Sequence, residues 1–75
     1  MKKLDTKFEA RIGALVREAR LANGMSQTAL GQRIGDVTFQ QVQKYENGVN
    51  RVAFSRMLRI AEATGRPLSF FVPKE

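Results

Sequence analysis

The chain has 75 residues, room for one small domain, and its 13 Lys and Arg outnumber its 7 Asp and Glu, so the formal net charge is +6. It contains neither cysteine nor histidine, which removes disulfides, thiolate metal sites, the commonest general base and the commonest metal ligand. We therefore expect no enzyme, no metal and no cofactor, and the positive charge favours a polyanionic partner: nucleic acid, an anionic membrane or an acidic protein.

Residues 1–6 are predicted to form a flexible basic arm. The segment that follows repeats its apolar residues at the spacing of one helical face. An Asn-Gly pair at 23–24 supplies the left-handed residue that commonly ends a helix. The sequence therefore predicts a first helix over 7–22. Its apolar face consists of Phe8, Ile12, Leu15, Val16 and Ala19.

A second, shorter helix is predicted to begin after Ser26, whose hydroxyl suits the N-cap position. Met25 before the cap and Leu30 within the helix are spaced for a hydrophobic staple. Gly35 ends the helix after about two turns. The residues predicted to face inward are Ala29, Leu30 and Ile34.

A third helix is predicted over 38–47, between Thr38 and a second Asn-Gly pair. Thr38 and Gln41 have the spacing of a capping box, in which each side chain bonds the backbone of the other residue. Val42 and Tyr45, three residues apart, form the apolar face of this helix. Gln41 also lies at the edge of the polar face, and the sequence leaves its two roles open.

A fourth helix is predicted to follow the loop 49–53 and to end at Gly65. Pro67 suits the first position of a short fifth helix. No segment alternates apolar and polar residues in the manner of a strand, so the fold class is predicted to be all-α with five short helices. The residues expected on the apolar face of the fourth helix are Phe54, Met57, Leu58 and Ala61.

The second and third helices are joined by only a few residues, and such a connection sets two helices at a large angle, as in a helix-turn-helix. The polar face of the third helix has chemistry suited to the major groove of DNA. Glutamine can bond an adenine edge twice, lysine can donate to guanine or to a phosphate, and phenylalanine can pack on a thymine methyl. The residues on this face are Phe39, Gln40, Gln43 and Lys44.

Two alternatives compete with DNA binding. Glutamines are good helix formers on a solvated surface, and for any single glutamine this explanation is preferred. The set as a whole, on the second of two closely coupled helices in a basic chain, favours DNA. Membrane-surface binding through the first helix is disfavoured, because Glu9 and Glu18 interrupt its arginines and its apolar face belongs to the core.

The stretch SQTALGQRIGDVTFQQVQKYENGVNR resembles the helix-turn-helix of the Cro and lambda-repressor-like family, also called the xenobiotic-response-element family. The resemblance runs from about Ile12 to Val72. Its most specific parts are MSQ..L, the string Gln-x-x-Lys-Tyr-Glu-Asn-Gly and the pattern L.IA.A.G in the fourth helix. It implies a compact five-helix DNA-binding domain over 7–72. It also implies a sequence-specific transcriptional regulator of a prokaryote or phage, most simply a repressor.

The resemblance implies roles for the matching positions. Gln27 matches a glutamine that contacts a phosphate and braces the reading helix, although it also fits as a plain first-turn polar residue. Arg20 and Glu46 match a structural ion pair beneath the reading helix, which we expect to be partly buried. For Arg51 and Arg56 a solvated surface charge is the alternative. The base-reading positions are Phe39, Gln40, Gln43 and Lys44. The phosphate-binding positions are Gln27, Thr38, Asn50, Arg51 and Arg56.

A homodimer on an inverted repeat is predicted, because a single reading helix contacts too few base pairs to select one site in a genome. The segment PLSFFV has more apolar residues than a very short helix can bury against its own chain. We expect Phe70 and Leu68 at the dimer interface. Capping of the monomer core is the alternative for Leu68 and Phe71.

A second function remains open at this stage: a protein-binding antitoxin of a toxin–antitoxin pair, which would also bind its own promoter. A small toxin would then be the protein partner. No apolar run approaches the roughly 20 residues that span a bilayer, and the start of the chain has no apolar signal segment. The expected location is therefore the cytoplasm, in association with the nucleoid.

Overall fold

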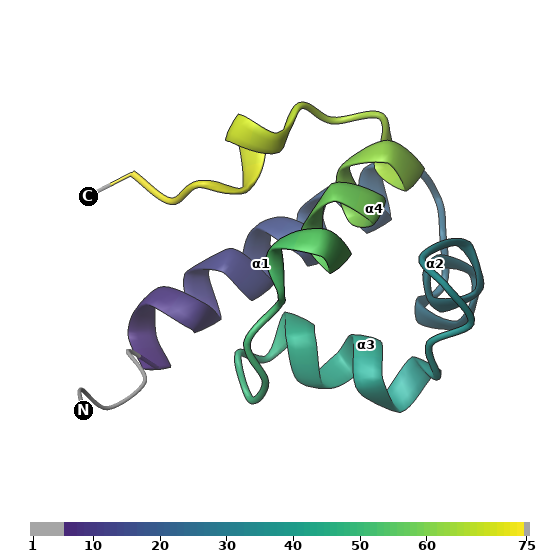
Figure 1. The fold of residues 1–75 in the computed structure, drawn as a ribbon, viewed down its shortest axis with the longest axis horizontal. Helices are drawn as coiled ribbons and strands as arrows, with labels where there is room; N and C mark the ends of the chain where they lie inside the picture. Colours follow the sequence, from purple (N-terminus) through teal and green to yellow (C-terminus); the bar gives the residue numbers. More distant parts are fainter. Residues whose placement is uncertain (1–5, 75) are drawn as a thin grey trace.

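The computed structural model describes residues 6–74, so the predicted basic arm lies outside the described residues except for Thr6, which begins the first helix. Four α-helices and one 3-10 turn form within this range (Figure 1). None of the described helices is long and apolar enough to cross a membrane. In chain order the elements are α1 (Thr6–Ala22), α2 (Gln27–Arg33), α3 (Phe39–Glu46), α4 (Phe54–Thr64) and η1 (Leu68–Phe71).

Side-chain caps begin the two central helices, as the sequence predicts. The Ser26 hydroxyl accepts a hydrogen bond from the backbone N–H of Ala29 at 3.0 Å, which begins α2. The Thr38 hydroxyl accepts from the backbone N–H of Gln41 at 3.2 Å, which begins α3. The Gln41 N–H also donates to the Thr38 carbonyl at 3.1 Å. Both helices therefore begin at a side chain that accepts from the backbone of the first turn, so both starts are determined by local chemistry.

The predicted fifth helix is wrong in type: η1 is a single 3-10 turn, and Pro67 is its N-cap residue rather than its first helical residue. Its hydrogen bonds span three residues, from the N–H of Phe70 to the carbonyl of Pro67 and from the N–H of Val72 to the carbonyl of Ser69. With a proline on either side the segment is too short for an α-helical ladder, so it closes in the tighter form.

The predicted apolar face of α4 is also wrong for two of its four residues. Phe54 and Leu58 are exposed, whereas Met57 and Ala61 are buried as expected. The buried face uses the positions at spacings of three, four and seven from Met57, which turns it away from Phe54 and Leu58. Its members are Met57, Ile60, Ala61 and Thr64.

One hydrophobic core lies where the four helices and η1 meet. In Figure 1, α1 runs behind the molecule, α4 crosses in front of it, α2 lies on the right and α3 runs along the lower edge. The core thus holds α3 from one side and leaves its other side at the edge of the molecule. The buried apolar residues are Val16, Ala19, Leu30, Ile34, Val42, Met57, Ile60, Ala61 and Phe71.

Two glycines allow the close approaches that position α3. A methyl group at Gly31 in α2 would overlap the carbonyl oxygen of Val37, just before α3. A methyl group at Gly13 in α1 would overlap the carbonyl oxygens of Tyr45 and Glu46 at the C-terminal end of α3. Backbone therefore lies directly against backbone at both ends of α3, which limits how far the helix can shift or tilt.

Candidate nucleic-acid interface

The exposed side of α3 is polar apart from Phe39. Val42 and Glu46 are buried, and Gln41 and Tyr45 are half-buried, so these four residues define the inner side of the helix. The helix packs against α1 and α2 through that side. All four residues predicted to read bases lie on the remaining, exposed surface: Phe39, Gln40, Gln43 and Lys44.

A buried ion pair lies beneath α3. The Arg20 Nε donates to Glu46 Oε2 at 2.7 Å, and Arg20 Nη2 donates to Glu46 Oε1 at 3.1 Å. The two side chains are 9% and 1% exposed. The Arg20 Nη1 also donates to the carbonyl of Met25 at 2.8 Å. A bidentate pair of this kind fixes direction as well as distance, so it ties α1 to α3 and to the start of α2.

Gln27 completes this cluster from the first residue of α2. Its Nε2 donates to Glu46 Oε1 at 3.1 Å, so the half-buried amide braces α3 from α2. The predicted phosphate contact of Gln27 stays a prediction. If the same amide group made that contact, it would have to give up or share its bond to Glu46.

Gln41 and Asn50 join α3 to the loop that follows it. The Gln41 Nε2 donates to Asn50 Oδ1 at 3.1 Å, and Asn50 Nδ2 donates to the carbonyl of Val49 at 3.3 Å. The capping box is therefore half formed, because Thr38 caps Gln41 while the Gln41 side chain bonds the loop instead. Asn50 is exposed and keeps an N–H that could face a phosphate.

The two predicted phosphate-binding arginines differ in their surroundings. The Arg51 side chain is 66% exposed, and its Nε lies 3.7 Å from Glu9 Oε2, a long ion pair. Arg56 is half-buried, and its Nη1 donates to the carbonyl of Ile34 at the C-terminal end of α2. A cation at that end also complements the helix dipole. Arg56 therefore holds α4 to α2, whereas Arg51 is free to turn toward a ligand.

The residues predicted for a dimer interface are half-buried. Leu68 packs on the edge of the core. The ring of Phe70 meets the ring of Phe71 edge to face at a centroid distance of 5.1 Å, and the Arg66 guanidinium lies 5.0 Å from the Phe70 centroid on its face. Contacts within the monomer therefore cover part of the surface that was expected to be free.

Asn47, which the sequence analysis treated only as part of a helix end, lies beside the residues predicted to read bases. Asn47 is exposed and is the C-cap residue of α3, seven residues or about two helical turns after Gln40, so it lies on the same side of the helix as Gln40. Its amide adds a donor and an acceptor to that face. The spacing of seven from Gln40 was the available signal.

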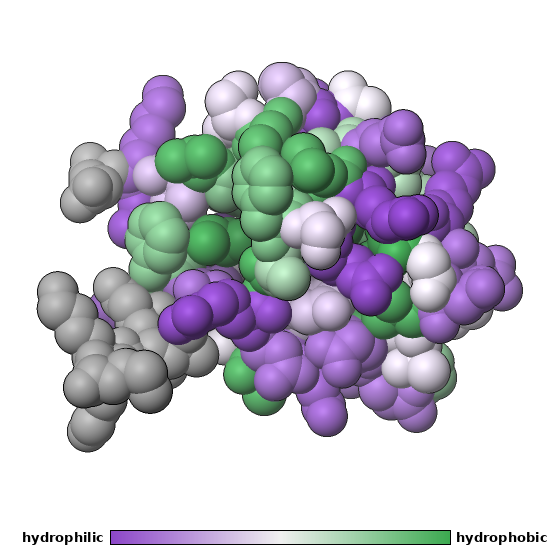
Figure 2. All heavy atoms as spheres, viewed as in Figure 1, coloured by the Kyte–Doolittle hydropathy of each residue, from purple (hydrophilic) through white to green (hydrophobic). Residues whose placement is uncertain are grey.

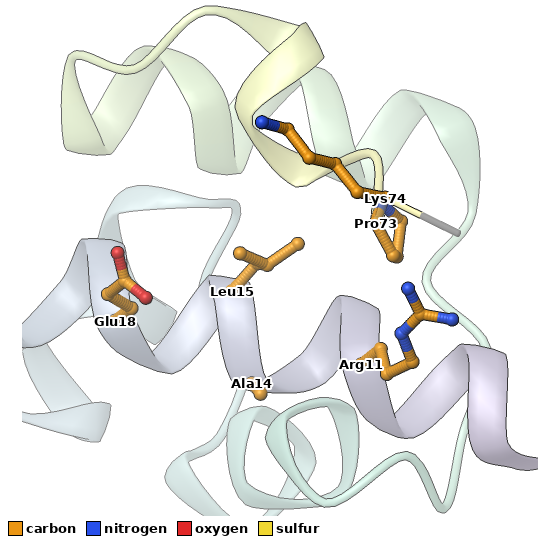
Figure 3. Close-up of a pocket in the computed structure, with 6 residues that line it drawn as sticks. All are labelled: Arg11, Ala14, Leu15, Glu18, Pro73 and Lys74. Atoms are coloured by element: carbon orange, nitrogen blue, oxygen red, sulfur yellow. The ribbon is translucent and has the colours of Figure 1, made fainter.

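A shallow groove lies on the opposite side of α1 from α3 (Figure 3). Arg11, Leu15 and Glu18 line it from α1, and Pro73 and Lys74 line it from the C-terminal segment. These α1 positions point away from the side on which Gly13 meets α3. The groove is therefore separate from the exposed face of α3. Among residues 6–74 no group of three or more acidic residues is placed to hold a metal ion.

Two short helices, α2 and α3, are joined by a tight turn. The second packs against α1 and α2 through its buried side and exposes mostly polar residues on the other side. This arrangement defines a helix-turn-helix domain of the kind that binds the major groove. The model of the Helix-turn-helix family HTH_3 matches residues 16–71. The chain belongs to this family of Cro/C1-type DNA-binding domains.

Several curated relatives have clearly similar sequences. An uncharacterized HTH-type transcriptional regulator of Sinorhizobium medicae (strain WSM419) is 44% identical over 70 residues, which cover 93% of this chain and 50% of that protein. The HTH-type regulator y4wC of Sinorhizobium fredii is 51% identical over 63 residues, covering 84% of this chain and 43% of that protein. The chain thus spans about half the length of the curated relatives it matches.

Solved structures agree in fold. The DNA-binding domain of BldD has a TM-score of 0.83 at 24% identity, over 93% of this chain and 100% of that one. Hydroxypropylphosphonic acid epoxidase from S. wedmorenis has a TM-score of 0.80 at 23% identity, over 91% of this chain but 36% of the enzyme. At these identities the likeness concerns the fold alone. The similarity to the enzyme is limited to about a third of its chain.

Proposed function

We propose that the chain is the DNA-binding part of a sequence-specific transcriptional regulator, most simply a repressor, in which α3 reads the major groove. The observation that supports this most strongly is the two-sided character of α3. Val42 and Glu46 are buried behind the helix, while Gln40 and Lys44 are exposed in front of it. The curated relatives named above are called transcriptional regulators, which supports the same role.

Base recognition follows from the chemistry of the exposed face. Gln40 and Gln43 can each donate to and accept from an adenine edge, and Lys44 can donate to guanine N7 and O6. Phe39 can pack on a thymine methyl. Each good bidentate contact discriminates against a wrong base by about 1–3 kcal/mol, so the reading residues define sequence preference rather than overall affinity.

Phosphate contacts supply most of the affinity in this proposal. Arg51 is the best placed of the candidates, because its side chain is exposed and its ion pair with Glu9 is long. Thr38 and Asn50 contribute polar groups beside α3, and Gln27 and Arg56 contribute where their existing hydrogen bonds permit. Because such contacts release counterions, binding falls steeply as salt rises.

Two copies bind an inverted repeat, with half-sites about 34 Å apart on one side of the duplex. One copy of α3 reads a few base pairs, and doubling that number raises selectivity to what a genome demands. Repression needs no further mechanism than occupancy of a promoter, which excludes RNA polymerase.

Selection of binding sites from random duplex DNA tests the proposal directly. Wild-type protein at low salt is expected to enrich a two-fold symmetric motif, and raising the salt is expected to weaken binding to it. Gln43→Ala should alter the motif while leaving the folded state intact. Failure of the wild-type protein to enrich any motif at low salt would overturn the proposal.

An antitoxin remains the alternative function, because the chain exposes an apolar surface that a protein partner could cover. A small toxin-like reading frame beside the gene, and a stable complex of its product with this chain, would favour that alternative. Absence of such a neighbouring reading frame would favour the main proposal. Full affinity of the chain for its DNA site without a protein partner would favour it as well.

A further inference from the structure

The loop that follows α3 is tied back to the end of that helix by backbone hydrogen bonds. The N–H groups of Val49 and Asn50 both donate to the carbonyl of Lys44, at 2.9 and 3.3 Å. The N–H of Gly48 donates to the carbonyl of Tyr45 at 3.1 Å. Asn50 therefore lies next to the helix that we propose reads DNA. Figure 2 shows mostly hydrophilic side chains along the lower edge of the molecule, where α3 runs in Figure 1.

The side chain of Asn50 is exposed and has one hydrogen bond to α3, in which the half-buried Gln41 is the donor. The Gln41 Nε2 lies 3.1 Å from Asn50 Oδ1. An asparagine amide has an oxygen that only accepts and an NH2 group that only donates, and the two ends have nearly the same shape. Because Gln41 supplies a donor, the oxygen of the Asn50 amide is directed at α3 and the NH2 group is left for other partners.

One N–H of the Asn50 side chain is available for a ligand. The Nδ2 atom donates to the carbonyl of Val49 at 3.3 Å, which occupies one of its two hydrogens. Among residues 6–74 the other hydrogen has no acceptor. A phosphate oxygen accepts such a hydrogen, and a hydrogen bond to a charged acceptor is stronger than one between neutral groups. With the opposite orientation, the amide oxygen would face the phosphate and repel it.

The neighbouring Arg51 is a phosphate ligand of a different kind. Its Nε lies 3.7 Å from Glu9 Oε2, and its side chain is 66% exposed. A guanidinium has donors on every side and carries a positive charge, so it needs no partner to determine which end faces a phosphate. Two adjacent residues of this loop are thus suited to phosphate in two ways: Arg51 through its charge and Asn50 through the direction of its amide.

We propose that Gln41 is a positioning residue for a phosphate contact: its side-chain N–H holds the Asn50 amide with the NH2 group outward, so that Asn50 donates to the DNA backbone. The inference rests on the proposed function and assigns a role to Gln41, which the sequence left between helix capping and the polar face. Holding the amide in its binding orientation before DNA arrives reduces the ordering cost of the contact.

A double-mutant cycle on a duplex of the selected motif tests whether Gln41 acts through Asn50. Asn50→Ala is expected to weaken binding about tenfold, and Gln41→Met about threefold to tenfold. The combined variant should bind as Asn50→Ala does, within about twofold. Gln32→Met, the same change at an exposed glutamine of α2, is the matched control and should keep wild-type affinity. Losses that simply add in the combined variant would refute the positioning role.

Gln41→Glu separates orientation of the amide from mere attachment of the loop. A glutamate only accepts, so it bonds the NH2 group of Asn50 and turns the amide oxygen outward while the loop stays attached. Gln41→Glu with Asn50 intact should therefore bind no better than Gln41→Glu combined with Asn50→Ala. Both chains carry the added negative charge, so its effect cancels. If Asn50 still improved binding about tenfold beside Gln41→Glu, the bond would only attach the loop, contrary to the proposal.

Salt dependence and sequence preference distinguish this contact from the others. Because an amide carries no charge, Gln41→Met should leave the slope of log affinity against log salt unchanged, whereas Arg51→Ala reduces it by about 1. The melting temperature should fall by less than about 4 °C, since the bond to Asn50 is exposed. The selected motif should also stay the same. A motif altered at one base pair would make Gln41 a base contact and exclude the positioning role.

The wild-type protein and Asn50→Ala together separate failure of this inference from failure of the proposed function. If the wild-type protein binds no duplex at low salt, the proposed function fails and this inference fails with it. If the wild-type protein selects a motif and Asn50→Ala binds that motif equally tightly, DNA reading stands and the role of Gln41 is refuted.

Discussion

The Arg20 guanidinium meets the Glu46 carboxylate through two hydrogen bonds, across a sequence separation of 26 residues. The pair is buried between α1 and α3, and Gln27 of α2 bonds the same carboxylate. Three helices thus converge on one acidic group beneath the face that we propose reads DNA. Within residues 6–74 the ion pair of each of these two side chains is with the other, so the domain should respond very differently to loss of one partner and loss of both.

Replacing Glu46 with alanine is expected to destabilise the domain by about 3 kcal/mol, because the Arg20 charge is then left buried without its partner. For a domain of this size such a loss lowers the melting temperature by about 12–24 °C. Thermal unfolding followed by circular dichroism measures the change. DNA affinity should fall with it, since α3 loses its brace.

Removing both charges supplies the control for that variant. A chain with Arg20→Met and Glu46→Leu has no uncompensated buried ion, so it should be markedly more stable than Glu46→Ala alone. If Glu46→Ala left both the melting temperature and the DNA affinity at wild-type values, the pair would have no structural role.

Gly31→Ala is expected to destabilise the domain by about 2 kcal/mol or more, although alanine is the better helix former by about 1 kcal/mol. The added methyl group overlaps the carbonyl of Val37, so the turn before α3 has to open. Gln32→Ala changes the neighbouring, exposed residue of α2 and should be close to neutral. Urea unfolding compares the two. A stabilised Gly31→Ala would mean that the turn adapts without cost.

Gln40→Ala is expected to relax the preference at its own base pair, with a loss of discrimination of about 1–3 kcal/mol there, and Lys44→Ala should do the same at another position. Gln40 is exposed at the centre of the outer side of α3, so its loss should affect the fold little. Site selection with each variant gives the readout. An unaltered motif for Gln40→Ala would remove that residue from the reading set.

Arg51→Ala is expected to weaken binding to all duplexes alike and to reduce the slope of log affinity against log salt by about 1, since a phosphate contact has no base preference. Stability should change by less than about 0.5 kcal/mol, because the Arg51 side chain is exposed and its ion pair is long. Affinity titrations at several salt concentrations test this. A change in preferred sequence would instead point to base contact.

Arg56→Ala should behave in the opposite way and cost about 1–2 kcal/mol of stability, because the Arg56 side chain bonds the carbonyl at the end of α2. Arg56→Lys keeps the charge near that helix end and should recover part of the loss. Chemical denaturation of the three proteins gives the comparison. If Arg56→Ala kept the stability of the wild-type protein but reduced the slope of log DNA affinity against log salt, Arg56 would be a phosphate contact instead.

Features determined by neighbouring residues could be predicted from the sequence. The caps at Ser26 and Thr38 depend on hydrogen bonds within one helical turn, and both form as expected. The inner residue Val42 follows from spacing along α3 in the same way. Arg20 and Glu46 were placed together only through a resemblance, because no pattern within one helix relates positions so far apart.

Contacts between elements could not be predicted from the spacing of residues along the chain. The bonds from Arg56 to Ile34 and from Gln41 to Asn50 depend on how α4 and the loop pack, which local spacing does not encode. The face of α4 was misjudged for a related reason. Apolar residues occur on two adjoining sides of that helix, and only packing against the core decides that Ile60 is buried while Leu58 is not.

The backbone contacts at Gly13 and Gly31 hold α3 through atoms that every amino acid shares, and none of them involves the groups that point outward. The residues that position α3 and the residues proposed to contact bases can therefore be changed independently of one another in this domain. A library that varies Gln40, Gln43 and Lys44 together would sample new target sequences on an unchanged scaffold, so this small chain is suited to evolve fresh binding preferences without rebuilding its interior.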